Sequence, residues 1–413
     1  MTDLKRNIEQ KIDGLLELFP IVIILGVRQC GKTTLAKNLK PEWRYFDLER
    51  AQDFEFITRD PDFFFKEHPH SIIIDEAQKY PPLFQELRGV IDRDRQRKNR
   101  FLLTGSSSLE LVKNVSETLA GRVGIIELGT LKINEKYSHP LPAFYQIFNL
   151  PIKTETIDFL RDVKPKVSHN EVMDTFFNGG YPELAVTRNR RFHRPWMENY
   201  LKTYVQRDIR SLFPRLDIIK YRRFIHMLAA LNGTIINRSQ VGRSLDISEK
   251  SIRDYLEIAE GSYVWRNLPS YAASFSKSIV KMPKGNFRDS GLSHFIQNVN
   301  SRDQLLNQPN VGAAFEAFVT EEIIKGIDTL DVTNWHYNYF RTKNGAEVDL
   351  ILEGPFGLLP IEIKFGTSIK QRQLQSLKNF IANENLPLGI VINNSEQVEL
   401  ISEKIIQLPA SCI

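Results

Sequence analysis

Apolar runs in the first third of the chain predict buried parallel strands. The residues IVIIL at 21–25 and III at 72–74 are continuously apolar, and RFLLTGSSS at 100–108 ends a third such run in small polar residues. Runs without alternation are typical of strands that are covered on both faces. A helix is predicted at TTLAKNLK, directly after the first run. The pattern therefore predicts an α/β domain, which we assign to residues 1–150.

Apolar residues recur at helical spacing in the middle of the chain, as in IIKYRRFIHMLAAL at 218–231. After a helical lid or connector at 151–215, the pattern predicts a helix, a short strand, a helix, a turn, a helix and a strand. The three helices are expected at 218–231, after an N-cap at Ser239 and after Ser248. The two strands are expected at TII and at YVWRNLPSY. The order is that of a winged helix-turn-helix, which we assign to residues 216–290.

Polar and apolar residues alternate in GAEVDLILEGPFGLLPIEIK at 345–364, which predicts a β-hairpin in a C-terminal α/β domain at 291–413. If the strands pair symmetrically about the GPFG connection, Asp349 lies opposite Glu362 and Glu347 lies opposite Lys364. These four side chains then share one face of the hairpin. The other face is predicted to hold Val348, Leu350, Ile361 and Ile363.

Three passages interrupt these patterns and predict seams between domains. Residues 136–154 are rich in proline and aromatic residues, Pro214 interrupts residues 210–217, and residues 281–291 carry a proline among turn-forming residues. The chain is therefore expected to divide into four domains.

Composition places the chain of 413 residues among globular proteins, with 42% apolar and 25% charged residues. A net charge of +5 allows an acidic partner without requiring one. Two cysteines cannot build a disulfide framework, and MTDLKRNIEQ lacks the apolar core of a signal peptide. We expect a cytoplasmic protein with no membrane partner, since the run at 21–25 is too short to span a bilayer.

The segment GVRQCGKTT at 26–34 fits the phosphate-binding pattern G-x-x-x-x-G-K-[ST]. The glycines let backbone N–H groups face a phosphate, the lysine reaches the β/γ-phosphates, and the threonine supplies a hydroxyl for Mg²⁺. The helix that follows adds the positive end of its dipole. We therefore predict ATP contacts from Gly26, Val27, Arg28, Gln29, Cys30, Gly31, Lys32, Thr33 and Thr34.

Acidic residues end the second apolar run, in SIIIDEAQ. Asp75 is expected to bind Mg²⁺ at the end of its strand, and Glu76 to act as the general base for the attacking water. Ser106 or Thr104 is a candidate sensor of the γ-phosphate, although a polar turn explains these residues equally well. Arg122 is either an arginine finger that reaches a neighbour in a homo-oligomer or a surface salt-bridge residue.

The third helix of a winged helix faces the major groove of DNA. Lys250, Ser251 and Arg253 lie at the start of this helix and are candidate base contacts, and Arg243 is a candidate contact to the phosphate backbone. Winged helices also serve as packing or protein-contact modules, and acidic residues lie among these basic ones. Both interpretations stay open.

Two carboxylates directly opposite each other on a ladder are destabilising unless a cation lies between them. Asp349 and Glu362 are therefore candidate ligands of Mg²⁺ or Mn²⁺, and Lys364 is a candidate for positioning water or stabilising a transition state. The spacing D-x(12)-E-x-K resembles the PD-(D/E)xK nuclease core. That resemblance implies a further acidic ligand from a preceding helix, where Glu316 stands at the matching position. A solvated hairpin with one salt bridge is the alternative.

The series GVRQCGKTT, RYFDLE, IIIDEAQ, LLTGSSS and LAGR resembles AAA+-type ATPases of the archaeal-ATPase-like group. In that group the core is fused to a C-terminal region known as DUF4143, which residues 176–184, 199–209 and 281–292 also resemble. The resemblance implies an α/β chain with a P-loop NTPase (AAA+-like) core, a helical connector, a winged helix and a restriction-endonuclease-like domain. The implied cofactors are ATP and Mg²⁺, with Mg²⁺ or Mn²⁺ at the nuclease-like site.

These observations support two hypotheses of different classes. The first is an ATP-hydrolysing enzyme that acts on nucleic acid, with DNA as the favoured partner, and that extends to metal-dependent cleavage. The alternative is an ATP-driven switch or scaffold, whose nuclease-like domain binds DNA or a protein without cutting. A third hypothesis is that ATP binding sets an oligomeric state.

Overall fold

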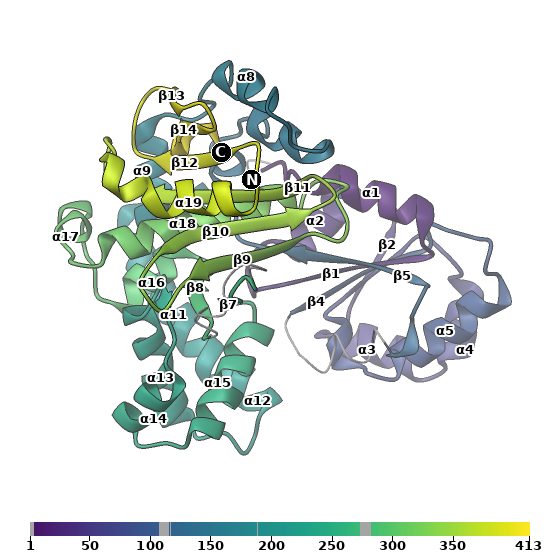
Figure 1. The fold of residues 1–413 in the computed structure, drawn as a ribbon. Helices are drawn as coiled ribbons and strands as arrows, with labels where there is room; N and C mark the ends of the chain where they lie inside the picture. The colour runs from purple at the N-terminus through teal and green to yellow at the C-terminus, as the bar shows by residue number, and fades with distance from the viewer. Residues whose placement is uncertain (1–3, 107–114, 116, 188, 273–281) are drawn as a thin grey trace. The chain divides into compact units, whose positions relative to one another are not determined.

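The computed structural model describes residues 4–106, 115, 117–187, 189–272 and 282–413 (Figure 1). The chain forms two compact units. The first unit comprises residues 5–130 with 261–263, and the second unit comprises residues 131–260 and 264–413 with the N-terminal residues up to Leu4. The first division of the chain therefore falls after Thr130, earlier than the end at residue 150 that the sequence predicts.

The first unit is built on a parallel sheet of five strands in the order β2-β3-β4-β1-β5. The strands are β1 (Ile21–Gly26), β2 (Arg44–Asp47), β3 (Ile72–Asp75), β4 (Phe101–Ser106) and β5 (Val123–Leu128). The continuous apolar runs are buried, which confirms the strands predicted from them. All five carboxyl ends lie at one edge of the sheet, where open α/β sheets bind ligands.

Five α-helices among the described residues cover this sheet: α1 (Glu9–Leu18), α2 (Lys32–Leu39), α3 (Ala51–Thr58), α4 (Pro61–Glu67) and α5 (Leu83–Arg93). Figure 1 shows α3, α4 and α5 gathered on one side of the sheet and α1 and α2 on the other. Leu83, Leu87 and Ile91 of α5 lie in one core cluster with Ile21 and Ile23 of β1. Their spacing of three or four residues turns one apolar face of α5 toward the sheet.

The winged helix lies in the second unit. Its elements are α13 (Ile218–Ala230), β6 (Thr234–Ile235), α14 (Arg238–Leu245), α15 (Glu249–Gly261), β7 (Trp265–Leu268) and β8 (Lys284–Phe287). The predicted N-cap of the second helix is wrong, because Asn237 and not Ser239 accepts a bond from the Gln240 N–H, at 3.1 Å. The predicted seam at 281–291 is also wrong, since β8 is the central strand of the antiparallel sheet β6-β8-β7.

The C-terminal part of the second unit is a six-stranded sheet in the order β13-β14-β12-β11-β10-β9. Its strands are β9 (His336–Arg341), β10 (Glu347–Gly354), β11 (Gly357–Lys364), β12 (Gly389–Asn393), β13 (Glu399–Ser402) and β14 (Ile405–Pro409). Side chains of α18 (Val311–Ile327) share one core cluster with Leu350 and Ile361. Side chains of α19 (Gln375–Asn383) share another with Ile351 and Val391, so each helix covers one face.

The predicted register of the β10–β11 hairpin is confirmed from Leu350, which pairs with Ile361, to Gly354, which pairs with Gly357. The predicted face of Val348 is wrong. A β-bulge between Val348 and Ile351 shifts the pairing of β10 with β9, and Val348 packs in the cluster of Ile351 rather than in that of Leu350. An inserted residue of this kind breaks the strict alternation on which the prediction depended.

Residues 136–154 form part of the core of the second unit rather than a seam. A 3₁₀ helix at Ala143–Asn149 buries Phe144, Tyr145, Ile147 and Phe148. The Tyr145 hydroxyl donates to the carbonyl oxygen of Glu322 at 3.0 Å, and the rings of Phe148 and Phe356 lie 5.0 Å apart. The aromatic residues that made this passage resemble a linker are thus its packing surface.

The sequence predicts that Pro214 interrupts the helical pattern, and α12 indeed ends at Leu212 while α13 begins at Ile218. The other α-helices in the described part of the second unit are α7 (Ile133–Lys136), α8 (Thr156–Arg161), α9 (His169–Asn178), α10 (Pro182–Val186), α11 (Arg190–Thr203), α12 (Arg210–Leu212), α16 (Ser290–Ile296) and α17 (Arg302–Leu306). In the described part of the chain, no helix has both the length and the apolar character needed to cross a membrane.

Candidate functional sites

The loop between β1 and α2 in the first unit has the conformation of an anion cradle. Gly31 has φ of 97°, a left-handed conformation that favours glycine, and a Cβ atom on Gly26 would overlap the carbonyl oxygen of Leu128. The Lys32 ammonium donates to the carbonyl oxygens of Gly26 and Val27, both at 3.0 Å. Its partners in the loop are therefore neutral groups, which leave its charge for a phosphate.

Neutral hydroxyl groups hold the Asp75 carboxylate at the end of β3. Thr33 and Tyr45 each donate to one carboxylate oxygen at 2.8 Å, and Thr104 donates to the other. Burial, followed by the hydrogen bond to Asp75, raises the pKa of Tyr45 above its usual value, so its hydroxyl stays a donor. Thr33 and Asp75 thus supply the adjacent hard oxygens that Mg²⁺ prefers.

Glu76, the predicted general base, adopts a left-handed conformation with φ of 55°. Ser106 donates to its carboxylate at 2.7 Å, and Gln78 donates both to this carboxylate and to the Ser106 hydroxyl. A non-glycine residue in this conformation is uncommon and is concentrated at functional sites. The structure therefore brings Glu76 together with Ser106 and Asp75 at one edge of the sheet.

The other predicted residues of the first unit differ in exposure. Gln29 and Thr34 are exposed, Arg28 is partly buried, and Cys30 is buried with its thiol 3.4 Å from the carbonyl oxygen of Leu128. Arg122 forms paired hydrogen bonds with Asp92, at 2.9 and 3.0 Å, which is the salt-bridge role considered for it. Its action as a finger in a homo-oligomer stays a prediction.

Sequence reasoning assigned no role to Tyr45 and Gln78. Tyr45 belongs to the segment RYFDLE, and β2 pairs in parallel with β3 so that Asp47 and Asp75 are register partners. The one available signal was a tyrosine two residues before the aspartate that ends β2. Only the pairing of β2 with β3 turns that signal into a contact with Asp75.

The predicted carboxylates of the second unit meet around two lysines. The Lys364 ammonium lies 3.1 Å from an Asp349 oxygen and 2.6 Å from a Glu362 oxygen. The backbone N–H of Ile363 donates to the same Asp349 oxygen at 2.8 Å. Asp349 and Glu362 are each 5% exposed, so little water screens their side of these contacts. The structure therefore assembles the acid pair and the lysine that the hairpin predicts.

Lys284 of β8 is a residue of this cluster that sequence reasoning missed. Its ammonium lies 3.0 Å from Glu316 of α18, 3.2 Å from Glu347 and 3.7 Å from Asp349. Glu347 is also held by Arg341, at 2.9 Å. No local pattern marks Lys284, because it reaches the cluster from the winged helix.

Burial and like charge raise the pKa of two acids in this cluster. Burial first, and then the Asp349 charge, raises the pKa of Glu316 to about 7 and that of Glu362 to about 9. One Glu362 carboxylate oxygen is buried without a hydrogen-bond partner. The cluster is therefore rich in oxygen atoms that could bind a metal ion, yet the two lysine ammonium groups already lie beside these oxygens.

The donor set has the right chemistry for Mg²⁺ or Mn²⁺, but the arrangement does not fit such an ion. Across the described ranges, no group of three or more His, Cys, Asp or Glu side chains is placed to hold a metal. The Lys284 ammonium lies between Glu316 and Asp349, two of the predicted ligands. The predicted metal site is therefore not formed in this conformation.

The predicted nucleic-acid contacts lie at the start of α15 and on α14. Lys250, Arg253 and Arg243 are exposed, and Arg253 forms an ion pair of 3.9 Å with Glu257. Ser251 lies with its hydroxyl 2.9 Å from that of Ser248, which caps the helix by accepting the Ser251 N–H. Lys250, Arg253 and Arg243 thus present positive charge to solvent, while Ser251 takes part in the helix cap.

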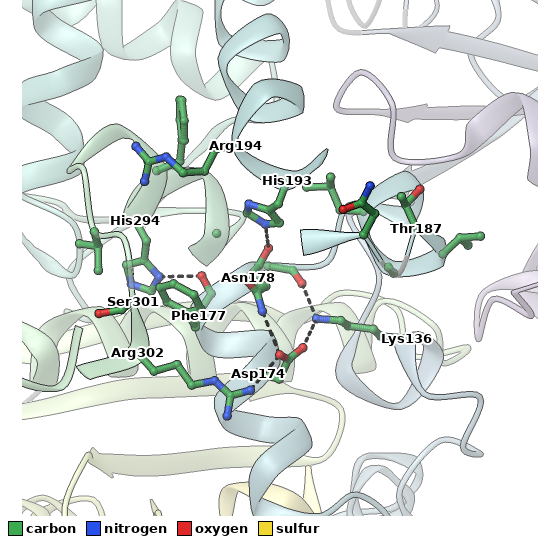
Figure 2. A pocket seen from close by; sticks show the side chains of 18 of the residues that line it. Lys136, Asp174, Phe177, Asn178, Thr187, His193, Arg194, His294, Ser301 and Arg302 are labelled. Atoms are coloured by element: carbon green, nitrogen blue, oxygen red, sulfur yellow. Dashed lines mark hydrogen bonds and ion pairs between the residues drawn. The ribbon is translucent and has the colours of Figure 1, made fainter. Parts of the chain in front are cut away.

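A cavity of about 1140 Å³ also lies in the second unit. Figure 2 shows Asp174 in its wall between Lys136 and Arg302, which lie 3.0 and 2.8 Å from its carboxylate. Burial raises the pKa of Asp174, but Lys136 and the hydrogen bonds of Tyr137 and Arg302 bring it down to about 2. Three successive carbonyls, of residues 177–179, face His294, His193 and the Lys136 ammonium at 3.2, 3.2 and 3.1 Å. The segment FFNGGYPEL therefore forms much of this wall.

Family models match three parts of the chain. An AAA domain matches residues 18–137, a domain of unknown function (DUF8612) matches residues 169–303, and a domain of unknown function (DUF4143) matches residues 311–413. The resemblance to an AAA+-type ATPase with a DUF4143 region is thereby confirmed. The segments at 176–184, 199–209 and 281–292, however, fall in the DUF8612 match.

The phosphate-binding loop, the acidic end of β3 and the AAA-domain match define a P-loop ATPase, which binds and hydrolyses ATP. Two curated proteins are 30% identical to this chain over 99% of its length and 84% of theirs: the uncharacterized proteins Rv2008c of Mycobacterium tuberculosis and Mb2031c of Mycobacterium bovis. The chain belongs to their family and joins an AAA domain to a DUF4143 domain.

Solved structures also match parts of this chain. The Walker-type ATPase PABY2304 of Pyrococcus abyssi is 14% identical, with 70% of this chain and 94% of that chain covered and a TM-score of 0.40. The RuvB Holliday junction branch migration motor of Thermotoga maritima is 18% identical, with 64% and 89% covered and a TM-score of 0.30. The Aeropyrum pernix ORC1 protein in complex with DNA is 10% identical, with 72% and 94% covered and a TM-score of 0.29.

Proposed function

We propose that this ATPase acts on nucleic acid and that the winged helix of the second unit carries the contact surface. The observation that supports the proposal is the exposed positive charge of Lys250 and Arg253 at the start of α15, with Arg243 on the preceding helix. A winged helix presents these positions to the major groove and the neighbouring phosphates. DNA is therefore the favoured partner.

ATP hydrolysis supplies the energy for this action. Lys32 binds the β/γ-phosphates, while Thr33 and Asp75 hold the Mg²⁺ that compensates phosphate charge when nucleotide is bound. Glu76 orients and deprotonates the attacking water, and Ser106, which donates to Glu76 at 2.7 Å, responds to the γ-phosphate. We propose that ATP binding and hydrolysis change the affinity of the second unit for nucleic acid.

A second candidate function is a switch whose nuclease-like domain binds DNA or a protein without cutting it. The observation that favours this candidate is the Lys284 ammonium, which lies 3.0 Å from Glu316 and 3.7 Å from Asp349. Metal-dependent cleavage at Asp349, Glu362 and Lys364 stays a prediction. It needs an ion that these side chains do not accommodate in their present arrangement.

The proposal is tested by measuring binding of labelled single-stranded, duplex and branched DNA over a range of salt concentrations, with and without ATP. The combined variant Arg243→Ala, Lys250→Ala, Arg253→Ala is expected to lower the slope of log K against log salt by up to about 3, since each phosphate contact contributes about 0.9. The matched control removes three other exposed lysines of the second unit: Lys153, Lys164 and Lys166.

The control variant is expected to keep the slope of the unchanged protein. Equal slopes in both variants would remove the winged helix from the contact surface. Absence of binding to every substrate, with or without ATP, would overturn the proposed function itself. Cleavage products in the same reactions, with Mg²⁺ or Mn²⁺ present, would favour the nuclease over the switch.

A further inference from the structure

A lysine of the winged helix enters the acidic cluster of the nuclease-like domain. Lys284 is the first residue of β8, and only 4% of its surface is exposed. Its ammonium contacts Glu316 at 3.0 Å, Glu347 at 3.2 Å and Asp349 at 3.7 Å. One acid comes from α18 and two come from β10. The cation and its carboxylates are therefore supplied by different parts of the second unit.

Removing an ammonium from water costs free energy, and the three carboxylates around Lys284 compensate that cost. Burial alone would lower the pKa of Lys284, but Glu316, Asp349 and Glu347 raise it above its usual value, so the group stays charged. The carboxylates depend on the lysine in the same way. Carboxylates that face each other across a short distance need a cation between them, and Lys284 supplies it.

The position of this ammonium is the one that a divalent ion would need. Mg²⁺ binds oxygen ligands at about 2.0–2.1 Å in a near-octahedral shell. An ion shared by Glu316 and Asp349 would have to enter the space that the Lys284 ammonium fills. A divalent ion beside this buried ammonium would also meet strong repulsion, because little water separates the charges. Lysine and metal are thus alternatives at this site.

We propose that Lys284 is the resident cation of this site and excludes divalent metal ions from the carboxylates of Glu316 and Asp349. The inference rests on the proposed function only in treating these residues as the nuclease-like site. β8 is paired on both sides, by β6 and β7, so it holds Lys284 in place. The domain remains metal-free while β8 keeps this position, and a metal ion enters only when Lys284 is removed or withdrawn.

The test is a titration of the nucleotide-free full chain with Mn²⁺, with free Mn²⁺ measured by electron paramagnetic resonance. Wild-type protein is expected to bind no ion that Glu316→Gln removes. Lys284→Met is expected to gain one ion per chain, bound at least tenfold more tightly than any ion at this site in wild type. Adding Glu316→Gln to that variant is expected to remove the gained ion.

Lys325→Met is the matched control, because Lys325 forms a 3.0 Å ion pair with Glu322 elsewhere in the same unit. It is expected to gain no ion. A folded Lys284→Met protein that gains no ion overturns the proposal. If that variant does not fold, Lys284→Gln and the wild-type titration decide the question, since an ion lost from wild type by Glu316→Gln also overturns it.

The readout separates this inference from the proposed function. Bound Mn²⁺ is counted without DNA, so a protein that never cuts DNA gives the same result in this titration. Failure of the winged-helix variants to change DNA binding would overturn the proposed function and leave the Mn²⁺ result intact. A Mn²⁺ site in wild type would overturn the role of Lys284 and leave nucleic-acid binding intact.

Discussion

Lys32 in the first unit and Lys284 in the second are buried to nearly the same extent, with 6% and 4% of their surfaces exposed. Their partners are opposite in kind. Lys32 donates to two neutral carbonyl groups, whereas Lys284 contacts three carboxylates. A lysine among neutral dipoles keeps its charge for an incoming anion, and a lysine among carboxylates has its charge compensated already. The first site is arranged to receive a ligand, and the second is arranged to exclude one.

The largest effect is expected from removing a carboxylate that compensates buried lysines. Asp349→Asn is expected to lower the free energy of unfolding of the second unit by about 3–5 kcal/mol, because Lys284 and Lys364 lose part of their compensation. Asp75→Asn in the first unit is expected to cost about 1–3 kcal/mol, since its donors are neutral hydroxyls. Urea unfolding checks both variants. Equal losses would contradict the comparison.

Removing the lysine of the ligand-receiving site is expected to affect activity rather than stability. Lys32→Ala is expected to lower the rate of ATP hydrolysis on the order of 100-fold or more, because the charge on the phosphates loses a preorganised partner. Lys66→Ala is the control, since Lys66 is exposed and forms an ion pair with Asp62 in the same unit. A steady-state phosphate-release assay decides, and equal rates in the two variants would disprove the assignment.

A pH dependence of stability is expected from Glu362. Its pKa is raised to about 9 in the folded chain, whereas an unfolded glutamate has a pKa near 4.3. Between about pH 5 and 9 the unfolded chain has released this proton and the folded chain retains it, so stability falls as pH rises. Glu362→Gln removes this trend, whose slope is about 1.4 kcal/mol for each pH unit in this range. Thermal unfolding at several pH values is the measurement, and parallel curves for the two proteins would contradict it.

The smallest effect is expected from removing one hydroxyl group in the first unit. Tyr45→Phe removes one of the donors to Asp75 and is expected to cost about 1 kcal/mol of stability. Thr33 and Thr104 still hold the carboxylate, so ATP hydrolysis is expected to change by less than tenfold. Differential scanning calorimetry and the phosphate-release assay measure the two effects. A loss of activity as large as that of Lys32→Ala would give Tyr45 a direct part in catalysis.

Local patterns were sufficient to predict the phosphate-binding loop and the register of the hairpin. The loop depends on glycines and a lysine at fixed spacing, and the register depends on the symmetric GPFG connection between Gly354 and Gly357. Both features are decided by interactions between neighbours in the sequence. They were therefore readable before any tertiary contact was known.

Features that arise from long-range packing were not readable in this way. Lys284 stands in a passage that looks like a linker, and only the pairing of β8 with β6 and β7 carries its ammonium to Glu347. The bulge after Val348 depends on the pairing of β10 with β9. The contact of Tyr45 with Asp75 likewise depends on the parallel pairing of β2 with β3.

The buried aromatic residues of Ala143–Asn149 have a consequence for how the protein is made. Tyr145 donates to Glu322, which the ribosome adds 177 residues later. The ring of Phe148 packs against Phe356, which is also added much later. Contacts so distant in sequence form slowly, and the apolar rings are exposed until they do. During synthesis the apolar rings of this short segment therefore stay exposed, and the segment becomes core only when the last third of the chain has emerged.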